Sequence, residues 1–284
     1  MQPPEKKSLA DWVDFLSKVE IPVLKQTARS LSTLRKDGDN LSARKMAQPI
    51  KNDPMMTVKL LRYLQLNKRS KQEHEVMEVE QVLMMLGLET ALNKVPTEPL
   101  VEEILNTKHT NSLICLLGVT HRANLTANYA FDWAVRLNDL HFEEVRIAAL
   151  LHDIAEILMW CFAPAEMLKI KAVQKQNKTL RSNVVQKHIF GFTLPELQSE
   201  LVVKWSLPKL LITLMDDQCI SQQRVRNVTL AVNLARHSAN GWDDAALPDD
   251  YEEIGALLHI KAEEVMVIVG AEKQPINEKN EVHA

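Results

Sequence analysis

The sequence has little glycine, and this shortage already narrows the choice of fold. Its 284 residues include 7 glycines, whereas an average chain contains about 7% glycine. A fold rich in tight turns, or a glycine-rich phosphate loop, therefore has little material here. Leu, Ala, Lys, Glu, Gln and Met dominate instead, and these residues favour helices. No stretch between turn signals alternates convincingly between apolar and polar residues, so we predict an all-α fold.

The sequence also lacks a dominant charge, a long apolar run and any regular cysteine spacing. The formal net charge is −3, so no whole-molecule field is expected to attract nucleic acid. No apolar run approaches the ~20 residues that span a bilayer. The polar start at Met1–Lys7 does not resemble a signal peptide. Cys115, Cys161 and Cys219 lie far apart and fit neither a disulfide framework nor a Cys-x-x-Cys site. We therefore expect a cytoplasmic chain with free thiols and with neither a membrane nor a nucleic-acid partner.

Turn and proline signals divide the predicted helices into two parts. Asp53-Pro54 combines a helix N-cap with a proline at the first helical position, and Gly87 ends a further helix. The segment from Pro96 to Pro99 is the best linker candidate and is too short for independent tumbling. We predict an N-terminal helical part at residues 1–99, a helical bundle with C-terminal helices at 100–270, and a flexible polar tail at 271–284. We expect a helix content above about 60%.

An adjacent pair, His152-Asp153, stands out inside the apolar stretch Glu143–Phe162, which we predict to be one helix. Both side chains are costly to bury alone. Imidazole nitrogen and carboxylate oxygen suit a divalent metal, and the metal can activate a water. His121 lies upstream on the preceding long predicted helix, and a short turn can bring the two helices together. Taken alone, the pair fits a hydrogen-bonded core histidine beside a surface Asp better than it fits a metal site.

Five segments in a fixed order resemble a known family. They are Glu20–Leu24, Ile50–Arg62, Val79–Leu88, Ala149–Asp153 and Trp205–Pro208. The pattern is similar to that of the HD-related output domain (HDOD) family of bacterial signalling proteins, a branch of the HD superfamily of metal-dependent phosphohydrolases. The resemblance extends over about residues 10–238. It implies an N-terminal helical part packed on a degenerate HD-like bundle, with His121, His152 and Asp153 at positions of the metal site.

The sequence departs from that family's metal-binding pattern at several positions. The superfamily's last Asp falls at Arg236, relatives that keep more of the site often carry His at Leu194, and Ala155-Glu156 replaces a glycine and a basic residue. A guanidinium about 5 Å from a divalent ion costs roughly 6–7 kcal/mol at an effective dielectric constant of about 20. The departures therefore favour a site that has lost its metal.

These comparisons lead to a specific expectation for the site. We expect a vestigial metal site at His121, His152, Asp153 and Arg236, with no resident metal and no other cofactor. Asp216 or Asp217 is a possible substitute ligand. We expect Arg236 to supply the positive charge that a buried Asp153 requires, because a guanidinium can satisfy a carboxylate with two hydrogen bonds.

The resemblance leaves three functional interpretations. The leading one is a bacterial regulatory protein that binds a partner protein or a nucleotide and is catalytically inactive. The second is a metal-dependent phosphohydrolase acting on a nucleotide or cyclic dinucleotide, in which Asp153 is catalytic and a metal-bound water attacks phosphorus. The third is a pseudo-enzyme that still binds a phosphorylated ligand. Metal analysis and an activity screen separate the first two.

Overall fold

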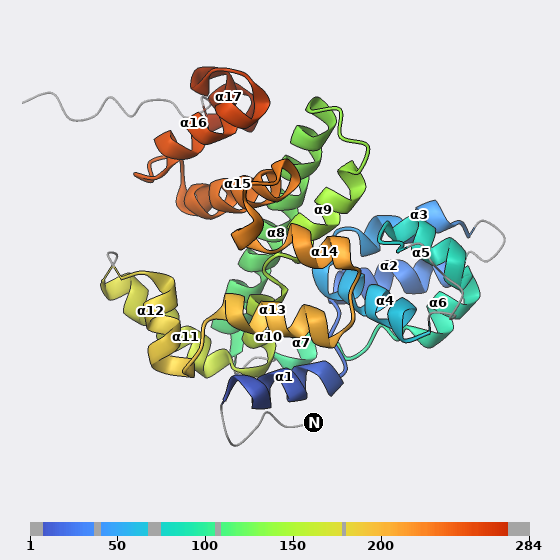
Figure 1. The fold of residues 1–284 in the computed structure, drawn as a ribbon. Helices are drawn as coiled ribbons and strands as arrows, with labels where there is room; N and C mark the ends of the chain where they lie inside the picture. Colours follow the sequence, from blue (N-terminus) through green and yellow to red (C-terminus); the bar gives the residue numbers. More distant parts are fainter. Residues whose placement is uncertain (1–7, 37–40, 68–74, 106–108, 178–179, 272–284) are drawn as a thin grey trace, which may run out of the picture.

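The computed structural model describes residues 8–36, 41–67, 75–105, 109–177 and 180–271. The structure is 77% helical, and within the described residues the only β-contact is an isolated parallel bridge between Val23 and Leu100. The prediction of an all-α fold with a helix content above about 60% is therefore confirmed. The helices are arranged as two groups, with α2 to α6 on one side and the longer bundle helices on the other (Figure 1).

The helices follow the chain in this order. Residues before the long helix α8 form α1 (Leu9–Lys18), α2 (Lys25–Lys36), α3 (Ala43–Ile50), α4 (Pro54–Leu66), α5 (Val79–Leu86), α6 (Leu88–Lys94) and α7 (Val101–Ile104). The rest of the chain forms α8 (Thr110–Arg136), α9 (Phe142–Leu151), α10 (Ile154–Phe162), α11 (Pro164–Gln176), α12 (Ser182–Phe190), α13 (Leu194–Lys204), α14 (Lys209–Leu214), α15 (Gln223–His237), α16 (Leu247–Leu258) and α17 (Ala262–Val269). A short 3-10 helix, Asp217–Cys219, joins α14 to α15.

The predicted helix start at Asp53-Pro54 is present and is more than a local cap. One oxygen of Asp53 accepts hydrogen bonds from the backbone N–H groups of Met55 and Met56 at 3.0 and 3.1 Å. The other oxygen accepts from the backbone N–H of Leu24 at 3.1 Å, and the side chain is fully buried. Asp53 therefore fixes the start of α4 and the segment before α2 at the same time.

A buried lysine, Lys59 of α4, connects two segments at the junction between the N-terminal helices and the bundle. Its ammonium group donates to the backbone oxygens of Ile21 and Glu98, at 3.0 and 2.8 Å. It also forms a 2.7 Å ion pair with Glu20. The Pro96–Pro99 linker is therefore held by hydrogen bonding where it passes α4.

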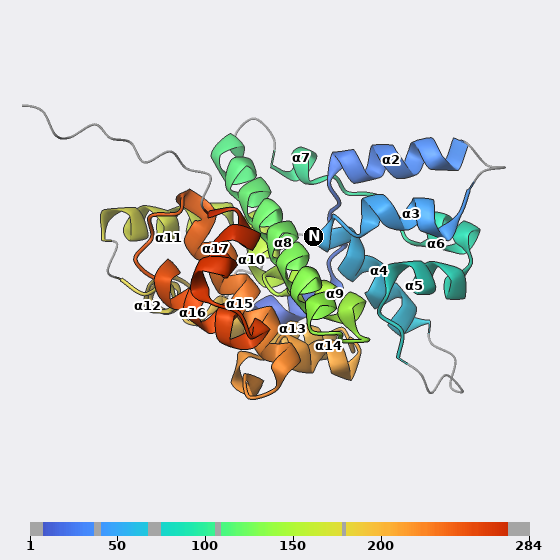
Figure 2. The ribbon, with the colours of Figure 1, turned by 90° about the horizontal axis from the view of Figure 1, so that it is seen from above.

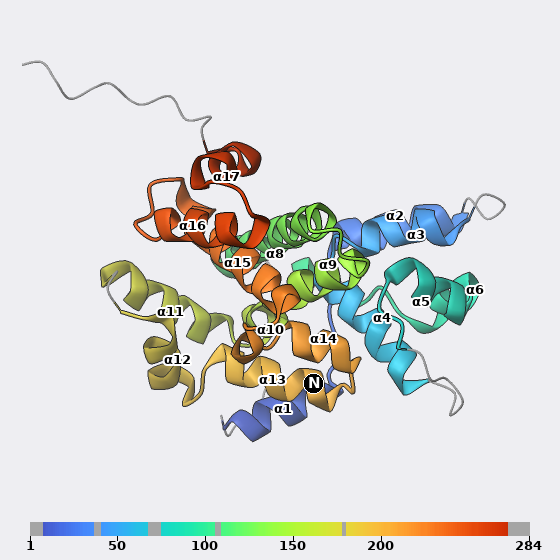
Figure 3. The same ribbon diagram turned by 45° about the horizontal axis from the view of Figure 1, so that its top comes forward.

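Helix α1 packs on the bundle, although its sequence belongs to the predicted N-terminal part. It lies against α13, with Trp12, Phe15 and Leu16 buried. Phe15 meets Phe162 of α10 edge to face, with ring centroids 5.3 Å apart. Figure 3 shows α1 beside α13 and separated from α2 to α6, and Figure 2 shows α2 to α6 together on one side of α8. The chain therefore crosses from the bundle to the N-terminal helices and back again through the linker.

The bundle is built around α8, which packs against α9, α10 and α15. Helices α16 and α17 pack on each other, and α16 covers α15 (Figure 1). No single described helix is both long and apolar enough to cross a bilayer; Phe142–Phe162 and Pro164–Gln176 pass that test only as a pair bent by 113°. The tail predicted at 271–284 lies outside the described residues except for Ala271.

Candidate functional site

The chain breaks its helix at the His-Asp pair. The prediction of one continuous helix over 143–162 is wrong, because α9 ends at Leu151 and α10 begins at Ile154. Gln198 of α13 spans the break: its amide donates to the oxygen of Leu151 at 3.0 Å, and its Oε1 accepts from the N–H of Ala155 at 2.9 Å. One backbone group on each side of the break is thus satisfied. Sequence reasoning missed Gln198, since nothing in its local sequence marks it.

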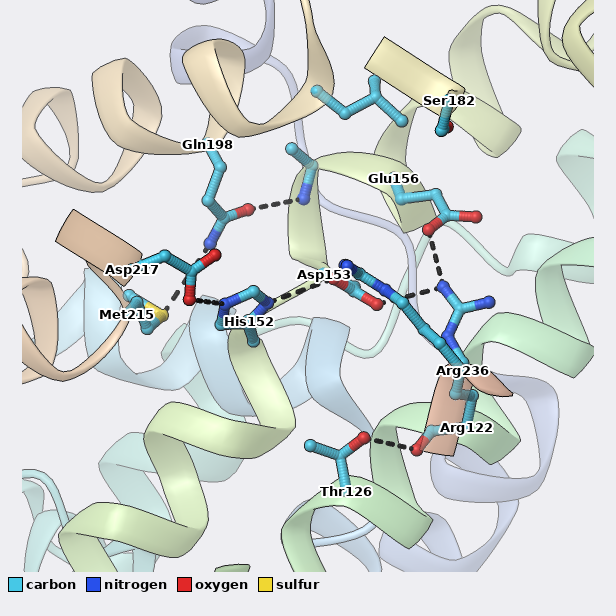
Figure 4. A network of polar contacts seen from close by, with 12 residues as sticks. Arg122, Thr126, His152, Asp153, Glu156, Ser182, Gln198, Met215, Asp217 and Arg236 are labelled. Atoms are coloured by element: carbon cyan, nitrogen blue, oxygen red, sulfur yellow. Dashed lines mark hydrogen bonds and ion pairs between the residues drawn. The ribbon is translucent and has the colours of Figure 1, made fainter. Parts of the chain in front are cut away.

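Six side chains from four parts of the chain form a continuous network of ion pairs around Asp153 (Figure 4). They are Arg122, His152, Asp153, Glu156, Asp217 and Arg236. Arg236 Nη2 donates to Asp153 Oδ1 at 2.6 Å, and Arg122 Nη2 donates to Asp153 Oδ2 at 3.0 Å. Each oxygen of the Asp153 carboxylate therefore receives a hydrogen bond from a guanidinium. The predicted pairing of Arg236 with Asp153 is present.

The residue of α8 that reaches the site is Arg122, and the expectation for His121 is wrong. His121 is exposed, is absent from the lining of the cleft and has no hydrogen bond or ion pair with His152 or Asp153. Successive residues on a helix point about 100° apart, so one position decides which side chain turns inward. Arg122 also donates to Glu156 Oε2 at 2.6 Å. Glu156 was noticed in the sequence only as a departure from the family pattern.

The two candidate substitute ligands, Asp216 and Asp217, have different roles. Asp217 Oδ1 lies 3.3 Å from His152 Nε2 and accepts a 2.9 Å hydrogen bond from Thr229. Asp216 lines the same cleft, but its Oδ1 accepts from the backbone N–H of Gln218 and so caps the 3-10 helix. Asp217 therefore joins the network through His152. Asp216 instead stabilises the 3-10 helix that carries Asp217.

Burial and ion pairing shift the pKa of His152 in opposite directions. Burial alone would lower the pKa, but the hydrogen bonds and charges of Asp153 and Asp217 outweigh it and raise the pKa of His152 to about 9. Both ring nitrogens face a carboxylate oxygen, at 3.2 Å for Asp153 and 3.3 Å for Asp217. A doubly protonated imidazolium, with a donor on each nitrogen, fits this arrangement.

Ion pairing also favours the charged forms of Asp153, Arg236 and Arg122. Burial by itself raises the pKa of Asp153, but Arg236, His152 and Arg122 together hold that pKa well below its usual range. The charge of Asp153 raises the pKa of Arg236. Burial opposes the charged form of Arg122, but Glu156 and Asp153 raise its pKa. Three cationic groups thus face three carboxylates, and the network is neutral as a whole.

A cleft of about 730 Å³ opens beside the network. All six members of the network line it, and most of its other lining side chains are polar. The neutral hydrogen-bonding residues on the wall formed by α11, α12 and α13 are Gln174, Ser182, Asn183, Gln186, Gln198 and Ser199. Three carboxylates outside the network, Glu196, Glu200 and Asp216, also line the cleft. The cleft therefore offers a ligand many neutral hydrogen-bonding groups and an excess of negative charge.

The residues of the site do not fit a divalent metal. Both nitrogens of His152 and both oxygens of Asp153 already engage ionised partners. Within the part of the chain that the structure describes, no group of three or more His, Cys, Asp or Glu side chains is arranged to hold a metal ion. The guanidinium groups of Arg122 and Arg236 both contact the Asp153 carboxylate, which would have to ligate the ion. Both groups would repel a cation bound there.

Comparison with known proteins identifies the fold. The sequence profile of the family described as HDOD domain matches residues 21–219. The response regulator MmoQ from Methylococcus capsulatus str. Bath superposes with a TM-score of 0.61 at 18% identity, over 89% of this chain and 99% of that one. A virulence factor from Campylobacter jejuni subsp. jejuni gives a TM-score of 0.60 at 18% identity, over 93% and 92% of the two chains. At this identity the likeness establishes a shared fold. A comparison with curated proteins gave no significant match.

Proposed function

Because this chain belongs to the HDOD domain family, we propose that it is a regulatory protein that transmits a signal by binding and is catalytically inactive. The observation that carries the proposal is the pair of guanidinium groups on Asp153, at 2.6 and 3.0 Å. In a phosphohydrolase of the HD type this carboxylate would bind the metal. Here its charge is compensated by Arg122 and Arg236, so the network is complete without an ion.

The cleft supports the binding part of the proposal. Its volume of about 730 Å³ lies within the range of about 300–1,000 Å³ typical of ligand sites. The amide and hydroxyl groups on its wall can hydrogen bond to a nucleotide or to the backbone of a partner protein, the two ligand classes that we propose. The neutral donors and acceptors support recognition by hydrogen bonding, and the further carboxylates Glu196, Glu200 and Asp216 disfavour attraction to a strongly anionic group.

Metal titration and an activity screen test the inactive state. We expect the wild-type chain, incubated with Mn²⁺ and desalted, to retain no stoichiometric metal and to hydrolyse neither nucleotides nor cyclic dinucleotides. The double variant Arg122→His, Arg236→Asp supplies two ligands in place of two cations and should gain measurable Mn²⁺ affinity by calorimetry. The variant Arg136→Asp, at an exposed position of α8, is the control. Stoichiometric metal in the wild type, together with turnover that His152→Ala abolishes, would show that the chain is an enzyme.

Identifying the proteins and nucleotides that co-purify with the chain from its source cell tests the proposed binding function. The exposed residues Asn183 and Ser199 line the cleft, so Asn183→Arg and Ser199→Arg would obstruct it without disturbing the core. We expect proteins or nucleotides that co-purify with the wild type to be lost from this double variant. An unchanged set of bound molecules would place the recognition surface outside the cleft.

A further inference from the structure

Helix α2 presents a stripe of positive charge to the solvent. Lys25, Arg29 and Lys36 are exposed, and at about 100° per residue they fall within about 40° of one another around the helix axis. Thr27 and Leu31, which face the core, lie on the opposite side. The stripe extends along about 16 Å of helix. The three cations therefore share one outward face of α2, on which the exposed Ser32 lies between Arg29 and Lys36.

The neighbouring helix α3 extends the basic surface. It packs against α2 and carries Arg44 and Lys45, both exposed. Neither α2 nor α3 contains an acidic residue. The basic surface is defined here by five exposed cations of the two helices: Lys25, Arg29, Lys36, Arg44 and Lys45. The sixth exposed cation, Arg35, donates a hydrogen bond to Asn93 Oδ1 and is not counted in it. None of the five forms an ion pair with any residue that the structure describes.

One carboxylate, that of Glu102, contacts the start of α2 through the backbone and not through a basic side chain. Glu102 accepts hydrogen bonds from the backbone N–H of Lys25, at 3.0 and 3.2 Å, and so caps the start of α2. Over residues 25–50 the sequence contains six Lys or Arg and two Asp, at positions 37 and 39. The whole chain, by contrast, carries a net charge of −3. Positive charge is thus concentrated on one local segment of an acidic protein.

The composition of the basic surface indicates the kind of partner. Protein interfaces are enriched in Tyr, Trp, Phe and Met and depleted in Lys and Ser, and membrane-binding helices insert exposed apolar side chains. The exposed residues of α2 are Lys, Arg, Gln, Ser and Thr. These are the side chains that contact phosphate oxygens in protein–DNA complexes. The surface also lacks aromatic platforms on which the bases of a single strand would stack.

We infer that the basic surface of α2 and α3 binds the phosphate backbone of double-stranded DNA without reading its sequence. The expectation that nucleic acid is not a partner rested on the net charge of the whole chain. A net charge does not show that positive side chains are concentrated on α2 and α3. B-DNA carries one negative charge per about 1.7 Å of axis, and each cation that neutralises a phosphate releases counterions. The surface lies outside the cleft, since no residue of α2 or α3 lines it, so the inference does not depend on the proposed function.

Fluorescence anisotropy with the full chain tests this inference. The probe is a labelled, mixed-sequence DNA duplex of about two helical turns, titrated at several salt concentrations. We expect wild-type binding at low salt, with log affinity falling against log salt at a slope of about −4. The triple variant Lys25→Gln, Arg29→Gln, Lys36→Gln should weaken binding about tenfold or more and make the slope shallower by about 3.

A second triple variant controls for net charge. Lys169, Lys175 and Lys204 are exposed on α11 and α13, and their replacement by Gln changes the net charge equally but should leave affinity and slope near those of the wild type. Equal weakening by both triple variants, or no wild-type binding at low salt, would overturn the inference. Tighter binding of the single strand, or equally tight binding of polyglutamate at the same charge, would overturn it in favour of a different anionic partner. Circular dichroism checks that both variants keep the wild-type helix content.

Discussion

Ion pairing raises the pKa of His152 more than burial lowers it, and the free energy of unfolding therefore depends on pH. The folded-state pKa of about 9 lies above the ordinary value near 6.5. The stabilisation is therefore complete below about pH 6.5 and is lost as pH rises through about 9. We expect the free energy of unfolding to fall by about 3 kcal/mol across this window. Urea unfolding at a series of pH values measures it. His152→Gln should lack this component, so an identical pH dependence in both proteins would contradict the assignment.

The two guanidinium groups on Asp153 differ in how much they stabilise the fold. The side chain of Arg122 is 19% exposed and serves two carboxylates, whereas that of Arg236 is 42% exposed and serves one. We expect Arg122→Ala to lower the free energy of unfolding by about 3–5 kcal/mol, because it strands buried charge. Arg236→Ala should cost about 1–2 kcal/mol after allowance for solvent screening.

The control for this pair of substitutions is Arg136→Ala. Arg136 forms an exposed ion pair with Asp132 one helical turn away, with the two side chains 48% and 56% exposed. Such pairs contribute about 0–1 kcal/mol. Denaturant unfolding of the three variants gives the comparison. A loss for Arg122→Ala no larger than that for Arg136→Ala would mean that Asp153 is solvated and needs no partner.

Among the secondary-structure elements, the break between α9 and α10 depends on a residue of a third helix. Gln198 is buried and satisfies one backbone group on each side of the break. We expect Gln198→Leu to lower the free energy of unfolding by about 2–4 kcal/mol, because it leaves a buried N–H and a buried oxygen unpaired. Ser199→Ala on the same helix removes a hydroxyl that is exposed and donates to Pro195 O, and it should change stability by less than about 0.5 kcal/mol.

The cap at Asp53 provides a second test at the level of the helix. Asp53 joins the start of α4 to the segment before α2 through three backbone N–H groups. We expect Asp53→Ala to lower the free energy of unfolding by about 2–4 kcal/mol, since buried donors lose their acceptor. Ser42→Ala removes an exposed cap with one hydrogen bond and should cost about 1 kcal/mol. Similar losses for both variants would show that Asp53 acts as a local cap alone.

At the scale of the whole molecule, the chain path joins the two groups of helices. Helix α1 packs on α13, while Lys59 of α4 bonds both the segment after α1 and the linker. Unfolding of either group would therefore expose apolar or charged groups of the other. We expect a single cooperative thermal transition by calorimetry, with matching calorimetric and van't Hoff enthalpies. Two well-resolved, independent transitions would show that the groups fold separately.

The sequence alone predicted the features that depend on local chemistry. The cap at Asp53 and the helix end at Gly87, which has a φ of +80°, follow from side-chain and backbone preferences acting within one helical turn. The family resemblance and the pairing of Arg236 with Asp153 were also accessible, because both rest on residue identity at fixed positions.

Tertiary packing alone decided which residues meet at the site. Whether His121 or Arg122 turns inward depends on the rotation of α8 against its neighbours, and adjacent positions differ by about 100°. The break at His152-Asp153 falls within a stretch whose apolar pattern suits an uninterrupted helix. It is bridged by Gln198, which lies 47 residues from Leu151 in the chain. Likewise, α1 joins the bundle through contacts with α13. These outcomes depend on contacts between segments that are distant in the sequence. The apolar pattern of one helix does not show which other helix packs against it.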